Sequence, residues 1–182
     1  MTAHIVVSRR IAERLWQHLF QNDLEQGAFL FARAEANDGA LTLVVEDSYL
    51  VPTRAWEVQL DVYLQMKDSE RAKIMQIARS RTLCAIDCHS HPHAATDVWF
   101  SPSDVAGISK FSAYAKWKLD RRPFAAMVWG EASVDAVVWS GDFDQPMTAT
   151  AVCITGDSPY TLTPTASWFR TPRGKHRFDL HE

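Results

Sequence analysis

The chain has the length and composition of one folded domain. A chain of 182 residues is long enough to bury about 70% of its unfolded surface. Its 47% hydrophobic residues, 23% charged residues and formal net charge of −3 exclude an intrinsically disordered protein. The only concentrated positive stretch is 170–177, which we interpret as a solvated tail. Nucleic acid is therefore not expected as a partner.

Cysteine content and hydropathy indicate the compartment. The three cysteines, Cys84, Cys88 and Cys153, form no Cys-x-x-Cys pair and follow no leader peptide. An odd number of cysteines suits a reducing compartment, where disulfides are rare. No stretch approaches the roughly 18 consecutive apolar residues of a membrane-spanning helix. We expect a cytoplasmic protein without membrane association.

The beginning of the chain predicts a helix followed by a β-hairpin. Ser8 suits the N-cap of a helix whose apolar residues recur at helical spacing over 11–20. Two strand-like segments follow at 27–34 and 41–46. The turn-forming sequence Asn37-Asp38-Gly39 lies between them. These two strands are expected to pair as a hairpin.

The remaining elements alternate between strands and helices. Further strands are predicted at 56–60, 82–88, 124–129, 134–139 and 148–155. Helices are predicted at 68–80 and from residue 102 to about 119. Neither an internal repeat nor a dividing linker is present. The pattern predicts a single α+β domain over residues 1–182, with a mixed sheet flanked by helices.

Two histidines at the end of a predicted strand are the first candidate metal ligands. The sequence His89-Ser90-His91-Pro92 follows the mostly apolar run 82–88. Residues two apart in an extended chain point to the same face, with Cα atoms roughly 6.6 Å apart. The rings of His89 and His91 can therefore converge on one ion. Cys88 is turned to the opposite face by the same alternation and is not expected to be a ligand.

A carboxylate follows at the start of the next helix. In Ser101-Pro102-Ser103-Asp104, the first serine suits the N-cap, the proline the first helical position and Asp104 the third. Taken alone, these residues suit an ordinary helix start with an acid placed against the helix dipole. Combined with the two histidines, Asp104 completes three protein ligands, which leave a tetrahedral Zn²⁺ one open position for water. The combination favours a catalytic metal site.

These residues resemble the signature of the JAMM metalloproteases, also called MPN+ or JAB-domain proteins. That signature is a Glu, then His-x-His-Pro, then Ser-x-x-Asp, and the chain matches it at Glu25, 89–92 and 101–104. The loop between the second histidine and the serine is longer than is usual in the family. The resemblance covers about 5–140 and leaves a C-terminal extension over 141–182. It implies an MPN/JAB-like fold with cytidine-deaminase-like α/β/α layering.

The resemblance also implies a role for each residue of the motif. Zn²⁺ would be held by His89, His91 and Asp104, and would activate a water molecule. Glu25 would act as the general base, although the local sequence alone does not distinguish it from any other loop acid. Ser101 would donate a hydrogen bond to the oxyanion of the tetrahedral intermediate, and in that role it is not expected to serve fully as the helix cap.

Members of this family cleave peptide or isopeptide bonds next to the C-terminus of ubiquitin or a ubiquitin-like protein. The resemblance therefore implies a ubiquitin-like protein or its conjugate as substrate and partner. The short connection between the predicted helix that carries Asp104 and the strand at 124–129 looks like the compact prokaryotic subfamily that accompanies ubiquitin-like pathways. Activating or conjugating enzymes of such a pathway are further candidate partners.

Other proteins with two close histidines fit the sequence less well. Non-haem iron oxygenases pair one histidine with the acid at close spacing. Cupins need a later histidine on a following strand, whereas the next histidine after His93 is His176. Amidohydrolase barrels need about 250 residues. A catalytically silent MPN scaffold that only binds partners is the alternative from a different class, although such scaffolds lose the metal ligands.

Aromatic residues stand out in the loop between the candidate ligands. The chain has seven tryptophans, most of which fall in predicted strands and are expected in the core. Trp99 and Phe100 lie instead between His91 and Ser101. We expect them either to line the substrate cleft or to pack on the helix that carries Asp104. The same loop contains His93 and Asp97, whose roles the sequence leaves open.

Overall fold

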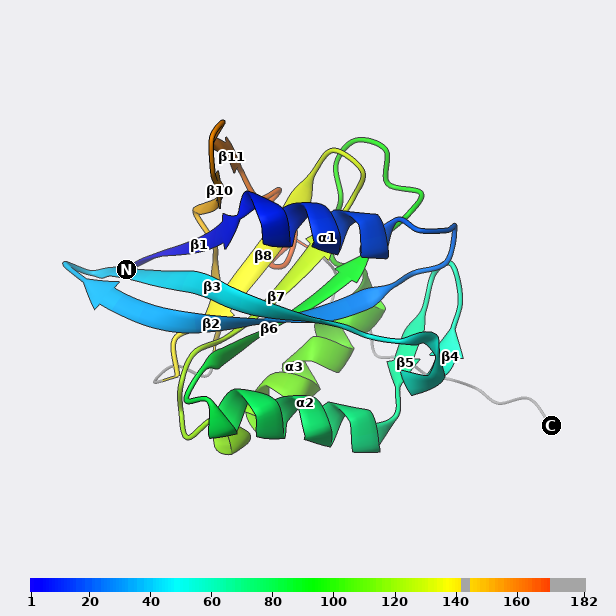
Figure 1. Ribbon diagram of the computed structural model, residues 1–182, viewed down its shortest axis with the longest axis horizontal. Coiled ribbons are helices and arrows are strands. Elements are labelled where there is room, and N and C mark those ends of the chain that lie inside the picture. Colours follow the sequence, from blue (N-terminus) through cyan, green and yellow to red (C-terminus); the bar gives the residue numbers. More distant parts are fainter. Residues whose placement is uncertain (142–144, 171–182) are drawn as a thin grey trace.

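The computed structural model describes residues 1–141 and 145–170 (Figure 1). Its helices are α1 (Arg9–Leu19), α2 (Asp68–Ser80) and α3 (Pro102–Lys118), with a 3₁₀ turn, η1, at Thr53–Ala55. Its strands are β1 (Thr2–Ser8), β2 (Gly27–Asn37), β3 (Ala40–Leu50), β4 (Trp56–Gln59), β5 (Leu64–Met66), β6 (Cys84–Ser90), β7 (Phe124–Trp129), β8 (Val134–Trp139), β9 (Met147–Thr148), β10 (Ala151–Thr155) and β11 (Tyr160–Leu162). Most of the basic stretch 170–177 lies outside the described residues.

A mixed sheet forms the centre of the described part of the chain. Its strand order is β11-β10-β1-β3-β2-β6-β7-β8-β9. The pairs β1/β10, β1/β3 and β6/β7 are parallel and the other neighbours are antiparallel. Helix α1 covers one face, whereas α2 and α3 cover the other (Figure 1). The predicted mixed sheet flanked by helices is confirmed.

Each face of the sheet has its own hydrophobic core. Ile11, Leu15 and Leu19 of α1 pack on one face. Ile74 of α2 and Phe111 of α3 belong to the cluster on the other face. Successive residues of β6 alternate between the two clusters, as strand geometry requires. The chain therefore buries apolar residues on both sides of its central strands.

The β2–β3 hairpin and the strand that carries His89 agree with the sequence analysis. The predicted turn joins β2 to β3, although both strands run further than expected. Strand β6 begins at Cys84 and continues through His89 to Ser90, between antiparallel β2 and parallel β7. Cys84 and Cys88 are buried on the α1 side, and all three cysteines are free.

Both ends of the described chain contribute strands that the sequence analysis did not resolve. No strand was predicted for β1, which is held by non-local pairing between β3 and β10. The strand predicted over 148–155 is wrong as one element, because β9 pairs with β8 while β10 pairs with β1. Between them, the amides of Ala149 and Thr150 donate to the carbonyls of Ala136 in β8 and Ala3 in β1, which lie in opposite halves of the sheet. The sheet is therefore curled, so that β9 lies beside β1.

Helix lengths and compositions bear on membrane association. Within the described residues, none of the helices combines the length and the apolar composition needed to cross a bilayer.

Candidate metal centre

Strand β6 and the residue after it carry the two histidines. His89 is paired in the sheet with Gly27 of β2 and Val128 of β7. The backbone amide of His91 donates to the carbonyl of Trp129 at 2.8 Å, so the extended course of the chain continues beyond β6. Both rings turn toward the start of α3, with ring centroids 5.1 Å apart. The alternation predicted from the sequence accounts for this arrangement.

A capping box at the start of α3 fixes the carboxylate. The Ser101 hydroxyl accepts a hydrogen bond from the backbone amide of Asp104 at 3.2 Å. In return, Asp104 Oδ2 accepts one from the backbone amide of Ser101 at 2.7 Å. The same Oδ2 lies 3.4 Å from His89 Nε2 and 3.3 Å from His91 Nε2. The cap thus orients the carboxylate toward both rings.

The spacing of these atoms suits a metal ion. One ligand atom from each of His89, His91 and Asp104 lies within 4.8 Å of the other two. A tetrahedral ion with ligands at 2.0 to 2.1 Å separates them by about 3.3 Å, which is close to the two histidine–aspartate distances. His89 Nε2 is buried and has no hydrogen-bond partner among the described residues. The group could therefore hold a metal ion, as the sequence predicts.

Glu25 lies beside this group, just before β2. Its side chain is only 5% exposed, and Glu25 Oε1 is 3.5 Å from His91 Nε2. The Glu25 backbone is held by the β4–β5 hairpin, because its amide donates to the Leu60 carbonyl and its carbonyl accepts from the Gln59 side chain, both at 2.9 Å. The structure therefore brings Glu25 to the candidate ligands.

Ser90 and Gln26 position Glu25 from the other side, and the sequence analysis did not identify them. Ser90 is fully buried, and its hydroxyl accepts a hydrogen bond from the Gln26 amide at 3.0 Å. The Ser90 amide donates to the Gln26 carbonyl, also at 3.0 Å. Ser90 lies between the two histidines in the motif, so the same segment that carries the ligands also fixes the residue next to Glu25. A small hydroxyl residue within the motif was the only signal for this role.

The charges in the site favour a cation. Burial raises the pKa of Glu25 to about 8, and the carboxylates of Asp104 and Asp61 add to the rise, although His89 opposes it. Burial alone would lower the pKa of His89, but Asp104, Glu25 and Asp87 outweigh it and raise that pKa to about 9. Burial likewise opposes ionisation of Asp104, but the two histidines hold its pKa well below the usual range. The ionised Asp104 beside the two imidazoles therefore favours a proton or another cation at this position.

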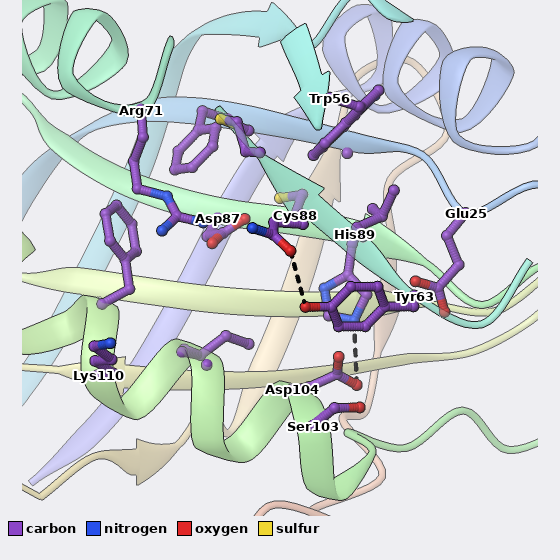
Figure 2. A pocket seen from close by; sticks show the side chains of 18 of the residues that line it. Glu25, Trp56, Tyr63, Arg71, Asp87, Cys88, His89, Ser103, Asp104 and Lys110 are labelled. Carbon is purple, nitrogen blue, oxygen red and sulfur yellow. Dashed lines mark hydrogen bonds and ion pairs between the residues drawn. The ribbon is translucent and has the colours of Figure 1, made fainter. Parts of the chain in front are cut away.

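A cleft of about 810 Å³ extends from the site (Figure 2). Its floor includes Asp87 and His89 of β6, with Glu25 at one end. Its walls come from the β4–β5 hairpin, α2 and α3, and its lining reaches as far as Lys110 and Tyr114. The hairpin also supplies Tyr63, whose hydroxyl donates to Gln65 at 3.4 Å. A ligand in this cleft would contact the candidate metal ligands.

The aromatic pair in the loop is divided between two environments. Phe100 is fully buried and packs against Trp168, with ring centroids 5.0 Å apart, and its ring centroid lies 6.2 Å from that of His89. Trp99 is 55% exposed and borders a second depression, together with Asp97. Neither aromatic residue lines the main cleft. The packing interpretation therefore holds for Phe100, and its main partner is the later residue Trp168.

The structure also shows the surroundings of two further polar residues, His93 and Ser101. His93 is exposed, and its nearest ionic partner is Asp61 at 3.9 Å, so it is not part of the ligand group. Ser101 caps α3, and both hydrogen bonds of the capping box are formed. A hydroxyl oxygen that accepts an amide hydrogen bond keeps its own proton for donation. In the structure, the hydroxyl groups of Ser101 and Ser103 form a hydrogen bond of 2.8 Å.

The fold and the site define an α+β protein with a candidate metal centre at the end of β6. No known protein family matches the sequence, and no curated protein matches it either.

Proposed function

We propose that the chain is a zinc-dependent metallopeptidase that hydrolyses the bond after the C-terminus of a ubiquitin-like protein. The observation that carries the proposal is the convergence of His89, His91 and Asp104 beside a buried Glu25 at one end of a cleft. Two imidazoles, one carboxylate and a neighbouring acid are the groups that metal-assisted hydrolysis requires. They also occupy the positions of the JAMM signature that the sequence resembles.

Each residue of the group has a distinct role in this proposal. His89, His91 and Asp104 would hold Zn²⁺, which lowers the pKa of a bound water and polarises the scissile carbonyl. The capping box orients Asp104 Oδ2 toward the imidazoles. Three protein ligands leave room for water and substrate, as in other catalytic zinc sites.

Glu25 accepts the proton of the attacking water and passes it to the leaving amine. The proposal is supported by its buried position, with the carboxylate 3.5 Å from the candidate ligand His91. Burial also increases the affinity of this carboxylate for a proton, which suits a group that must take one up and release it near neutral pH. The hairpin and Ser90 hold its backbone on both sides.

Ser101 stabilises the intermediate through its remaining proton. When the hydroxyl turns from Ser103 to the developing oxyanion, it still accepts the amide of Asp104. Removal of one such donor in other hydrolases costs roughly 3 kcal/mol of transition-state stabilisation. Cap and oxyanion donor are therefore compatible roles for one hydroxyl.

The surface next to the cleft supports a protein substrate. Leu60, Val62 and Tyr63 of the β4–β5 hairpin are 49%, 68% and 38% exposed, and Tyr63 also lines the cleft. Clustered apolar side chains beside a site commonly mark contact with another protein. Under this proposal the hairpin contacts the ubiquitin-like domain, and the enzyme acts in the cytoplasm alongside activating or conjugating enzymes.

The direct test combines metal analysis with a cleavage assay. We expect the purified protein to bind one equivalent of Zn²⁺ and to cleave a ubiquitin-like fusion in a reaction that a chelator stops and added zinc restores. The His91→Ala variant serves as the matched control and should lose both properties. Stoichiometric zinc without cleavage of any ubiquitin-like fusion would favour the partner-binding scaffold instead.

A further inference from the structure

The loop between the metal ligands is held by a segment that lies far away in the sequence. This segment, residues 163–170, is called the strap here. The Thr165 hydroxyl donates to the carbonyl of Val98 at 2.6 Å. The backbone amide of Phe100 donates to the Ser167 hydroxyl at 2.9 Å. The strap therefore binds the loop immediately before Ser101, where α3 and the candidate ligand Asp104 begin.

Asp135 of β8 holds the strap in place through hydrogen bonds. This residue is fully buried, and its Oδ1 accepts hydrogen bonds from the amides of Ala136 at 2.8 Å and Ala166 at 3.1 Å. Its Oδ2 accepts the amide and the hydroxyl of Ser167 at 2.7 and 2.5 Å. All four partners are donors, so this site requires a group that only accepts, which is a carboxylate.

The direction of these hydrogen bonds determines what Ser167 can do. Its proton is donated to Asp135, so a lone pair of its oxygen is left to face the Phe100 amide. The next amide along the chain, that of Ser101, donates to Asp104 Oδ2. The amide of Phe100 is thus held by Ser167, which is itself held by Asp135, and the amide of Ser101 is bonded to the candidate metal ligand Asp104.

The ring of Phe100 adds a second connection. It stacks edge-on against Trp168 of the strap, and its centroid lies 6.2 Å from the ring centroid of His89. Trp168 is 1% exposed and also packs against Trp139. Movement of the strap would therefore displace both the backbone that orients Asp104 and the ring beside His89.

We infer that Asp135 and Ser167 are positioning residues for the metal centre. They do not touch the ligand group; they act through Phe100 and Ser101, which keep Asp104 facing the two histidines. The inference rests on the metal centre of the proposed function but not on its hydrolytic step. Outer partners that orient metal ligands typically change metal affinity by 10- to 100-fold when they are removed.

The test compares the zinc affinity of Ser167→Ala with that of the wild-type protein. The variant leaves the Phe100 amide without this acceptor but keeps the other three hydrogen bonds of Asp135. We expect its zinc affinity, measured by competition with a chromophoric chelator, to fall roughly tenfold. Ser112→Ala, which removes a hydroxyl bonded to Ser109 on a later turn of α3, is the matched control and should bind as wild type.

Asp135→Asn provides a second variant. The NH₂ group must face either the amides of Ala136 and Ala166 or the amide and hydroxyl of Ser167, so the strap loses at least the hydrogen bond from the Ala166 amide or the one from the Ser167 amide. Its zinc affinity should also fall below that of the wild-type protein. If Asp135→Asn does not fold, the result for Ser167→Ala decides the question.

The outcomes separate this inference from the proposed function. A Ser167→Ala protein that unfolds at a lower temperature but binds zinc as tightly as wild type would reduce Ser167 to a purely structural role and overturn the inference. Weakened zinc binding in this variant, in a protein that cleaves no ubiquitin-like fusion, would support the inference and contradict the peptidase. A wild-type protein that binds no zinc would overturn both.

Discussion

At the scale of single residues, Glu25 shows how position creates a chemical role. It is one of 22 acidic residues, and nothing in its neighbours along the sequence distinguishes it. In the folded chain it is 5% exposed and lies 3.5 Å from His91, whereas most acidic residues in the described part of the chain are exposed. The family resemblance selected Glu25. Under the proposed function its position matters, because a buried acid next to a bound metal ion can exchange a proton with a bound water.

The Glu25→Gln variant tests this role. Gln has nearly the same size but cannot accept a proton, so we expect zinc binding to persist while cleavage falls by about 10²- to 10⁴-fold. Single-turnover cleavage and metal content should be measured on the same sample. Glu13→Gln, a change at an exposed position on α1, is the control. Normal turnover by Glu25→Gln would remove Glu25 from the base role.

The titration of His89 predicts how metal affinity changes with pH. Its pKa is raised to about 9, so this imidazole is largely protonated at neutral pH before a metal binds. A metal ligand must give up that proton, and zinc affinity should therefore rise as the pH increases toward 9. Each displaced proton corresponds to about a tenfold change per pH unit. Competition titrations at several pH values check this, and a flat profile would contradict it.

At the scale of elements, local patterns account for the ligands but not for their supports. The alternation of β6 and the helix-start signals before Asp104 are short-range, and they predicted the ligand group from the sequence. The contacts of Ser90 with Gln26 and of Ser167 with Phe100 join distant segments. No local rule specifies such contacts, because they depend on how the strands and loops are packed together.

The β4–β5 hairpin is a second example of an arrangement that local sequence patterns do not specify. Its first strand was predicted, but its place over Glu25 follows from the packing of Trp56 onto β2. At Gly27 an added Cβ atom would lie 2.6 Å from Cη2 of Trp56. Only glycine allows this close approach, and Gly27 is also the sheet partner of His89. One residue thus links the hairpin to the strand that carries the ligands.

Gly27→Ala should therefore disturb the cleft. We expect the displacement of Trp56 to lower the free energy of unfolding by about 1 to 3 kcal/mol and to reduce cleavage more than zinc binding. Gly107→Ala on α3 is the matched control, because no atom outside its own helix lies within 4 Å of the added Cβ. That change should be neutral or stabilise the protein by about 0.5 to 1 kcal/mol. Chemical denaturation measures both, and equal effects of the two variants would contradict the packing argument.

At the scale of the whole molecule, the site is built from segments that are far apart in the described chain. Glu25, the two histidines, Asp104 and the strap belong to four separate segments, and all of them depend on one curled sheet. Ala149 and Val152 belong to one core cluster and Trp168 to the other, so residues beyond 140 take part in both cores. A ligand that binds this site therefore stabilises the folded state as a whole.

Zinc should raise the unfolding temperature of the entire protein. At a free concentration 100 times its dissociation constant, a ligand adds about 2.7 kcal/mol to the free energy of unfolding. For a chain of this size, that corresponds to a shift of about 5 to 10 °C. His89→Ala should fold without showing this shift in a calorimetric scan. An unfolding temperature of the wild-type protein that does not change with zinc would contradict a site coupled to the global fold.

The pairing of β1 with β10, which joins His4 to Ala151, has a consequence for biosynthesis. Polypeptides leave the ribosome from the N-terminus at roughly 5 to 20 residues per second, so seconds pass between the emergence of His91 and that of Ser167. During that interval both imidazoles are available on the nascent chain, but the strap that supports the orientation of Asp104 is not yet made. We expect tight metal loading to await the emergence of the strap, so that metal acquisition reports on the folding of the segments that support the site.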